Sequence, residues 1–162
     1  MTSDKIVPLE ELQKRARDLR AIGKKIVATN GCFDLLHVGH VRYLKAARAF
    51  GDALIVGING DRSVRELKGR GRPVNSEMDR AEVVVALGSV DLVAIFPELL
   101  ATRFLEVVRP DVYVKGGDYK ENTLNQEECD VLKKMGAKIE IVPLEKGYST
   151  SDLLTRMGTA GQ

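Results

Sequence analysis

The sequence predicts an α/β fold in which a parallel sheet of about five strands is covered by helices on both faces. Two observations lead to it. Short apolar runs alternate with amphipathic segments along the chain, and Gly or Pro stands at the ends of many of these segments. The chain has 162 residues, of which 44% are hydrophobic. That is the size of one compact domain, so we expect a single domain over residues 1–162 with one binding site.

Several apolar runs have the length and composition of buried strands. They are residues 26–30, 53–59, 90–96, 111–116 and 138–142. The carboxyl ends of parallel strands meet at one edge of the sheet, which is where α/β proteins bind their ligands. We therefore expect the functional residues directly after these runs.

Helical periodicity fills the segments between the predicted strands. We expect helices at residues 8–22, 38–50, 61–68, 77–87, 99–108 and 126–135, with one more beginning near Ser151. The first belongs to a leading amphipathic segment, residues 1–23, that could serve as an oligomer interface. Ser76 followed by Asp79 predicts a capping box for the helix over 77–87. Residues 158–162 are expected to form a loose tail.

Charge and cysteine content exclude several classes of protein. The net charge is +2, which gives no overall field for binding nucleic acid or an anionic membrane. We expect no signal peptide and no membrane span, because the most apolar stretch is interrupted by Gly88, Ser89 and Asp91. Cys32 and Cys129 are far apart in the chain, so we expect free thiols and a cytoplasmic location.

The two histidines of the chain, His37 and His40, lie in the segment GCFDLLHVGH, between the first predicted strand and the next helix. Residues three apart share one helix face, so both imidazoles can point the same way from the first turn. Free backbone N–H groups and the positive end of the helix dipole favour an anion there. Gly39 has no Cβ, so a ligand can approach the backbone closely. The segment therefore predicts a phosphate site.

Two other interpretations of this segment have less support. Isolated histidines at a helix end usually have no functional role, but two in one turn with Gly between them make that interpretation weak. Cys32, Asp34, His37 and His40 include possible zinc ligands. Their spacing does not match the usual paired zinc motifs, and no second His or Cys cluster exists, so we expect no protein-bound metal.

At this point the sequence resembles the HxGH nucleotidyltransferases, a family with a small Rossmann-like sheet. The resemblance covers nearly the whole chain. Its motifs are GCFDLLHVGH, NGD at 59–61, LKGRGRPVN at 67–75, Arg80, VKGGDY at 114–119 and GYSTSDLL at 147–154. The combination of LKGRGRPVN with VKGGDY is most similar to the adenylyltransferases that convert ATP and D-glycero-β-D-manno-heptose 1-phosphate into ADP-heptose and pyrophosphate for lipopolysaccharide core assembly. No P-loop and no dinucleotide-binding glycine motif is present.

The resemblance implies roles for particular residues. His37 and His40 would donate hydrogen bonds to phosphate in the transition state, and Lys68 and Arg80 would hold phosphate. The acceptor-binding set is Lys68, Arg72 and Arg80. The nucleotide-binding set is Asn30, Gly31, Cys32, Phe33, Asp34, His37, Gly39, His40, Asp61, Lys115, Gly116, Gly117, Asp118, Ser149, Thr150 and Ser151.

Each of these assignments has a plainer alternative. Lys68 and Arg72 could belong to a solvated basic surface. Asp61 could cap a helix, as could residues 149–151, and the Gly116–Gly117 pair could be a simple turn. Cys32 is expected to be a small packing residue. Asn30, Asn59, Asn75 and Tyr119 are candidates for binding the acceptor hydroxyls, although each could have an ordinary turn or cap role.

The resemblance also implies substrates and partners. ATP would arrive with Mg²⁺, which needs few protein ligands. A separate sugar kinase would supply the sugar 1-phosphate, and a homo-oligomer is expected. Related cytidylyltransferases carry an arginine where this chain has Leu144, which weakens the alternative of a cytidylyltransferase for glycerol 3-phosphate. An adenylyltransferase for flavin mononucleotide and a non-catalytic nucleotide sensor also remain as alternatives.

Overall fold

A five-stranded parallel sheet forms the centre of the computed structural model, which describes residues 4–117, 124–143 and 146–159. The strands are β1 (Ile26–Gly31), β2 (Ala53–Asn59), β3 (Leu92–Phe96), β4 (Val112–Gly116) and β5 (Lys138–Val142). Their order is β3-β2-β1-β4-β5. The order reverses at β1, because the chain continues from β1 to β2 on one side and later adds β4 on the other. The predicted parallel sheet is confirmed, and the reversal marks where a ligand crevice is expected.

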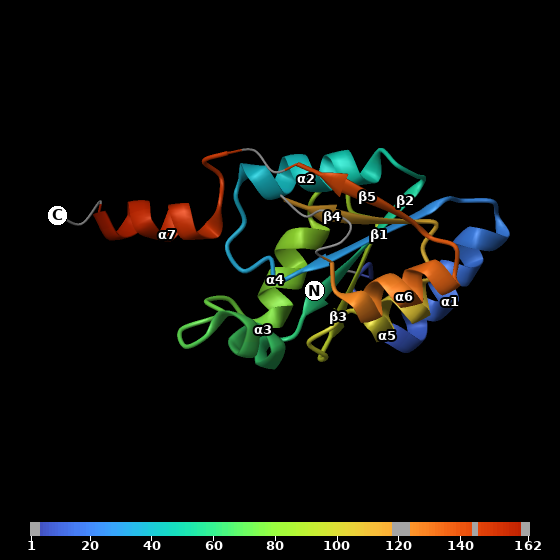
Figure 1. Cartoon of the computed structure of the whole chain (residues 1–162), viewed down its shortest axis with the longest axis horizontal. Helices are drawn as coiled ribbons and strands as arrows, with labels where there is room; N and C mark the ends of the chain where they lie inside the picture. The colour runs from blue at the N-terminus through green and yellow to red at the C-terminus, as the bar shows by residue number, and fades with distance from the viewer. Residues whose placement is uncertain (1–3, 118–123, 144–145, 160–162) are drawn as a thin grey trace.

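Helices cover both faces of this sheet (Figure 1). The helices are α1 (Leu9–Ala21), α2 (Val38–Arg48), α3 (Asp61–Lys68), α4 (Glu77–Val85), α5 (Thr102–Val108), α6 (Gln126–Lys134) and α7 (Thr150–Thr159). Side chains of α2 and α4 pack on one face of the sheet, and side chains of α1, α5 and α6 pack on the other. Alternate residues of each central strand enter the two cores, which is why these strands are apolar throughout.

The ends of two helices follow from side-chain capping. The Ser76 hydroxyl accepts a hydrogen bond from the Asp79 backbone N–H at 3.2 Å and begins α4, as predicted. Asn125 caps α6, with its Oδ1 accepting from the N–H groups of Glu127 and Glu128. The Asn125 cap was not predicted, although Asn before a helical run is a known signal.

The segment before α1 differs from the prediction of a purely helical leader. Ile6 forms a parallel bridge with Val93, and the Val7 N–H donates to the Val93 carbonyl at 3.0 Å. This segment therefore lies along the open edge of β3. The apolar stripe of α1 is also used within the chain, because Leu12 and Ala16 are fully buried. The stripe remains accessible only at its end, where Ile22 is 70% exposed.

The last helix extends beyond the predicted boundary. Gly158 and Thr159 belong to α7, so the loose tail expected from residue 158 is wrong for these two residues, and residues 160–162 lie outside the described part. One glycine near a helix end costs only about 1 kcal/mol relative to alanine, which does not stop a helix. Figure 1 shows α7 extending away from the sheet. Within the described residues, every helix is too short or too polar to cross a membrane.

Candidate active site

The loop after β1 brings the two histidines together. His37 is the N-cap of α2, in an extended conformation with φ −141° and ψ 172°, and His40 lies in the first turn. Their ring centroids are 4.0 Å apart. The His37 backbone N–H donates to His40 Nδ1 at 3.4 Å. Because Nδ1 accepts, we assign the proton of the neutral His40 ring to Nε2.

Both imidazoles are neutral near pH 7. Burial, together with a smaller effect from repulsion between the two rings when both are protonated, lowers the pKa of His40 to about 4. Burial also lowers the pKa of His37, with the charge of Arg156 adding to the shift. Neutral imidazoles donate one hydrogen bond each, so these rings act as hydrogen-bond donors and not as fixed cations.

Gly39 has a packing role in addition to the one predicted. A Cβ at this position would lie 2.9 Å from two atoms of the His37 ring and 3.0 Å from the Cβ of Tyr148. A side chain at this position would therefore collide with His37 and Tyr148. His37 Nδ1 is buried and has no hydrogen-bond partner among the residues that the structure describes.

Phe33 adopts a left-handed backbone conformation in the same loop, with φ 48°. This conformation costs a bulky residue roughly 1–2 kcal/mol. The Phe33 ring is buried, and its centroid lies 5.6 Å from that of His40. The loop is therefore held in a strained shape beside the histidine pair, a feature that the residue types alone did not predict.

Asp34 fastens this loop to the basic loop before α4. Its carboxylate accepts from Arg72 Nε at 2.6 Å and from the N–H groups of Val74 and Asn75 at 2.9 Å, while Asn75 Nδ2 donates to the Asp34 carbonyl. Burial alone would raise the pKa of Asp34, but the hydrogen bonds from Asn75, Val74 and Arg72 outweigh it and lower the pKa. Asp34 and Asn75 thus fix the shape of the site.

Arg80 lies beneath the site, which corrects the prediction that it holds phosphate directly. Its side chain is fully buried. The guanidinium donates to the carbonyls of Asn75, Cys32 and Asn59 and pairs with Asp61 at 2.9 Å. Arg80 therefore joins the carboxyl ends of β1 and β2 to the start of α4. Asp61 is neither a cavity residue nor the N-cap of α3, a position that Gly60 occupies.

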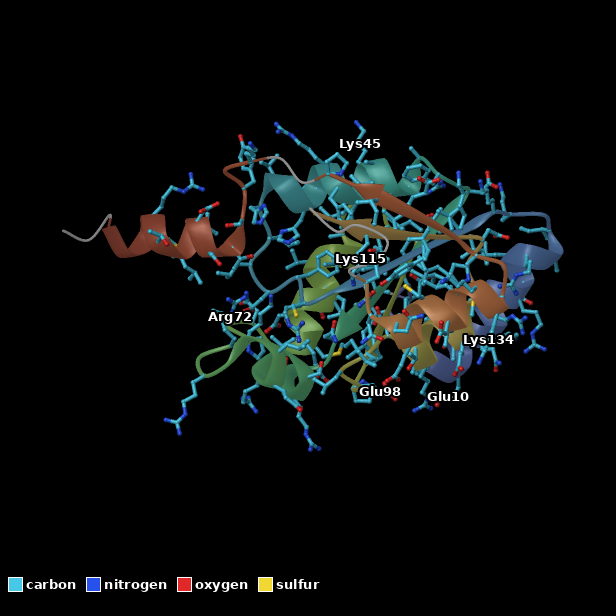
Figure 2. All side chains as sticks on the ribbon, viewed as in Figure 1. Glu10, Lys45, Arg72, Glu98, Lys115 and Lys134 are labelled. Carbon is cyan, nitrogen blue, oxygen red and sulfur yellow. The ribbon has the colours of Figure 1, made fainter. Side chains whose placement is uncertain are left out.

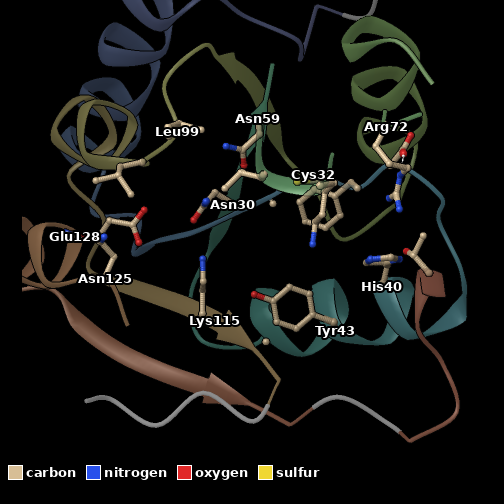
Figure 3. Close-up of a pocket in the computed structure, with 18 of the residues that line it drawn as sticks. Asn30, Cys32, His40, Tyr43, Asn59, Arg72, Leu99, Lys115, Asn125 and Glu128 are labelled. Carbon is tan, nitrogen blue, oxygen red and sulfur yellow. Dashed lines mark hydrogen bonds and ion pairs between the residues drawn. The ribbon is translucent and has the colours of Figure 1, made fainter. Parts of the chain in front are cut away.

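These elements surround an open cavity of about 600 Å³ at the carboxyl ends of β1, β2 and β4 (Figure 3). The predicted residues that line it are Asn30, Gly31, Cys32, Phe33, Asp34, His40, Lys68, Arg72, Lys115, Gly116, Thr150 and Ser151. The described residues that were predicted but do not line it are His37, Gly39, Asp61, Arg80, Gly117 and Ser149. Asp118 and Tyr119 lie outside the described residues.

Lys115 is a half-buried charged group at the cavity. Burial lowers the pKa of its ammonium group, while the negative charge of Glu128 acts in the opposite direction. Figure 2 shows Lys115 inside the outline of the molecule, whereas Glu10 and Lys45 extend from the surface. Cys32 is a free thiol, and burial raises its pKa, so it is protonated near neutral pH.

Several lining residues were not predicted. They are Tyr43, Leu67, Leu99, Leu100, Leu124, Asn125 and Glu128, and Asn59 was named only as a general candidate. Leu99 and Leu100 follow the carboxyl end of β3, so the position of the strand could have identified them. Glu128 lies inside a helix and has no sequence signal of this kind. The described residues contain no group of three His, Cys, Asp or Glu side chains placed to hold a metal ion.

Comparison with known proteins gives consistent results. A model of the cytidylyltransferase-like family matches residues 28–156. The chain is 47% identical over 153 residues to the bifunctional protein HldE of Koribacter versatilis, covering 94% of this chain and 31% of that protein. It is 47% identical over 156 residues to HldE of Pseudomonas aeruginosa, covering 96% of this chain and 32% of that one. The chain thus spans about a third of the length of these relatives.

Two solved structures have a similar fold. The lipopolysaccharide core biosynthesis protein from Thermoplasma volcanium has a TM-score of 0.64 and 29% identity, over 78% of this chain and 100% of that one. A pantoate–beta-alanine ligase from Francisella tularensis has a TM-score of 0.60 over 99% of this chain and 79% of that one. At 13% identity, the second structure is evidence for the fold alone.

Proposed function

The chain belongs to the cytidylyltransferase-like family of nucleotidyltransferases, and we propose that it transfers AMP from ATP to D-glycero-β-D-manno-heptose 1-phosphate. The products would be ADP-heptose and pyrophosphate. The relatives named HldE and the protein of lipopolysaccharide core biosynthesis support this acceptor over others. The observation that carries the proposal is the position of His40 at the cavity, with the ring of His37 against it at the start of α2.

The proposed reaction needs no general base. A phosphate monoester has a second pKa of about 6, so the acceptor phosphate is already an anionic nucleophile near neutral pH. Its oxygen would attack the α-phosphorus of ATP, and the bond to the pyrophosphate oxygen would break in line. The chain must therefore orient the two substrates and stabilise the charge that develops on the phosphate oxygens.

The residues around the cavity suit that task. His40 would donate from Nε2, and His37 would act beside it. Lys68 and Arg72 also line the cavity and would hold phosphate as cations. The backbone N–H groups at the start of α7, at Thr150 and Ser151, would bind the triphosphate.

We also propose that Mg²⁺ enters with the triphosphate. The described residues offer no cluster of three carboxylate, imidazole or thiolate groups for it. This fits an ion held mainly by phosphate oxygens and water. When bound, the ion supplies neutralisation of phosphate charge.

Pyrophosphate release tests the proposal. The protein is incubated with Mg²⁺ and ATP, CTP or GTP, each with heptose 1-phosphate, glycerol 3-phosphate or flavin mononucleotide. We expect release only with ATP and heptose 1-phosphate. Release with a different pair would keep nucleotidyl transfer and reject this acceptor. Binding of ATP without release from any pair would favour a nucleotide sensor.

A further inference from the structure

Strands β1 and β4 separate toward their carboxyl ends. β1 pairs with β2 along its whole length, ending with Gly31 opposite Ile58, and β4 pairs with β5 to its last residue. Between the described residues of β1 and β4, in contrast, the ladder has only two residue pairs, and Ala28 with Tyr113 is the last. The two strands therefore part before they reach the cavity, at the point where the strand order reverses.

A tyrosine hydroxyl on each face of the sheet joins these strands beyond the end of the ladder. On the face covered by α2, the Tyr43 hydroxyl donates to the Val114 carbonyl at 3.0 Å. Its single proton is used there, so it accepts from the Thr29 hydroxyl, at 2.6 Å. On the other face, the Tyr113 hydroxyl donates to Asn30 Oδ1 at 2.5 Å. Side-chain hydrogen bonds thus replace the backbone ladder on both faces.

The Tyr113 hydroxyl has a second partner at the cavity. Lys115 lies two residues later on β4, so its side chain is on the same face of the sheet. Its Nζ donates to the Tyr113 hydroxyl oxygen at 3.3 Å and lies 5.8 Å from the centroid of the ring. One hydroxyl therefore accepts from the lysine and donates to Asn30. Figure 3 shows Asn30 and Lys115 extending toward each other in the cavity.

Tyr113 reaches the cavity through these two partners. It is 1% exposed and is not among the described residues that line the cavity, whereas Asn30 and Lys115 both line it. An amide can present either its oxygen or its NH₂ group, and the bond to Oδ1 selects the NH₂ group of Asn30 for a ligand. A lysine side chain is long and flexible, so holding it in place before a ligand arrives lowers the entropic cost of binding.

We propose that Tyr113 is a positioning residue for nucleotidyl transfer, whose hydroxyl orients the Asn30 amide and the Lys115 ammonium toward the substrates. The inference rests on the proposed function. It holds whether these two groups meet the nucleotide or the acceptor, because the hydroxyl fixes both groups in the same way in either case. Tyr113 itself does not contact a substrate.

Tyr113→Phe tests this role, because it removes the hydroxyl and keeps the ring. With ATP and heptose 1-phosphate both held well below their KM values, the rate of pyrophosphate release reports losses in substrate binding and in transition-state stabilisation. We expect Tyr113→Phe to lower this rate about tenfold. Thr29→Val is the matched control: it removes a buried hydroxyl that joins α2 to β1 on the opposite face, from a residue that does not line the cavity. Its rate should stay within about twofold of wild type, although both variants should lower the urea midpoint.

A second comparison separates positioning from a purely structural role. If Tyr113 acts through Asn30 and Lys115, its hydroxyl should lose its effect when both groups are absent. In protein that carries Asn30→Ala and Lys115→Met, the further change Tyr113→Phe should alter the rate less than about twofold. If this double variant is too slow to assay, the dissociation constant for ADP-heptose serves for the same comparison, since that product contains parts of both substrates.

The opposite results would overturn the inference. A tenfold loss on adding Tyr113→Phe to the double variant would show that the hydroxyl acts on the fold and not through its two partners. An equal loss of rate in Thr29→Val would assign the effect to the junction of the strands. A fully active Tyr113→Phe protein would reject the positioning role alone. Wild-type protein that releases no pyrophosphate from ATP and heptose 1-phosphate would reject the proposed function, and this inference with it.

Discussion

Two properties of His40 bear on its proposed role as a donor to phosphate. It is neutral at physiological pH, because burial lowers its pKa to about 4, and its proton is directed by the hydrogen bond that Nδ1 accepts from the His37 N–H. A neutral donor binds the charged ground state of ATP less strongly than a lysine does. It can still stabilise the additional charge that develops during transfer, which favours turnover over tight substrate binding.

Removing either imidazole should therefore affect turnover more than binding. We expect His37→Ala and His40→Ala each to lower kcat about a hundredfold, because loss of one transition-state donor costs roughly 3 kcal/mol. The KM for ATP should change much less. Steady-state kinetics of pyrophosphate release measures both quantities. Cys32→Ala, a change in the same loop, should retain activity, and equal losses of binding and turnover in the histidine variants would argue against the donor role.

The low pKa of His40 also predicts how stability depends on pH. The folded pKa of about 4 lies below the unfolded value of about 6.5. Between these values the unfolded chain binds the proton more readily, so acidification destabilises the fold through this group. From pH 7.5 to pH 5 the loss should reach at most about 2 kcal/mol in the free energy of unfolding, since the ring is partly exposed.

Urea unfolding of wild type and His40→Asn at both pH values measures this contribution. Asparagine Oδ1 can replace Nδ1 as the acceptor from the His37 N–H but does not titrate in this range. The variant should therefore lose less stability on acidification than wild type does. Parallel losses in the two proteins would show that His40 is protonated as easily when folded as when unfolded.

At the scale of elements, the cavity depends on buried side chains that join the segments around it. Arg80 donates to backbone carbonyls of the loop after β1, the end of β2 and the residue before Ser76. Asp34 holds the loop between α3 and α4 against the loop between β1 and α2. Three loops that carry lining residues thus share one buried polar network, and such networks fix a single arrangement when all their members are paired.

Arg80→Met should therefore reduce stability rather than phosphate affinity. It leaves buried carbonyls and Asp61 without their partner, which we expect to cost about 3 kcal/mol or more in the free energy of unfolding. Arg103→Met is the matched control, since Arg103 is 56% exposed and pairs with Glu98 at the surface, and it should cost less than about 1 kcal/mol. Chemical denaturation compares them. A stable Arg80→Met protein with a raised KM for ATP would restore the direct phosphate role.

The sequence predicted these elements better than it predicted their contacts. The strands at 53–59 and 138–142 and the helix at 61–68 have the predicted bounds, because continuous apolar runs and local end signals determine them. The contacts of Arg80 and Glu128 were missed because most of their partners are backbone groups distant in the chain, which no local pattern reveals. The bridge from Ile6 to Val93 was missed for the same reason.

At the scale of the whole molecule, the site lies where the strand order reverses, and this position follows from topology alone. The sequence predicted a ligand crevice at the carboxyl ends of the strands and the histidine loop directly after the first strand, but it did not predict the strand order. The buried carboxylate of Glu128 at the cavity was not predictable, because no local pattern places a residue inside a helix at a ligand site. The expected homo-oligomer stays a prediction, to be checked by light scattering.

Ligand binding should stabilise the whole fold, because the cavity is built from loops on several elements that unfold together. With ATP and Mg²⁺ at about 100 times the dissociation constant, we expect a gain of about 2.7 kcal/mol, which raises the Tm by roughly 5–10 °C in a domain of this size. Thermal denaturation at a series of nucleotide concentrations measures it, with CTP as the matched ligand. His40→Ala should keep most of the ATP-dependent shift, since its imidazole is assigned to the transition state. If His40→Ala lost that shift together with activity, His40 would contribute to binding ATP before transfer. If CTP produced an equal shift, the enzyme would select the nucleotide during transfer and not in binding.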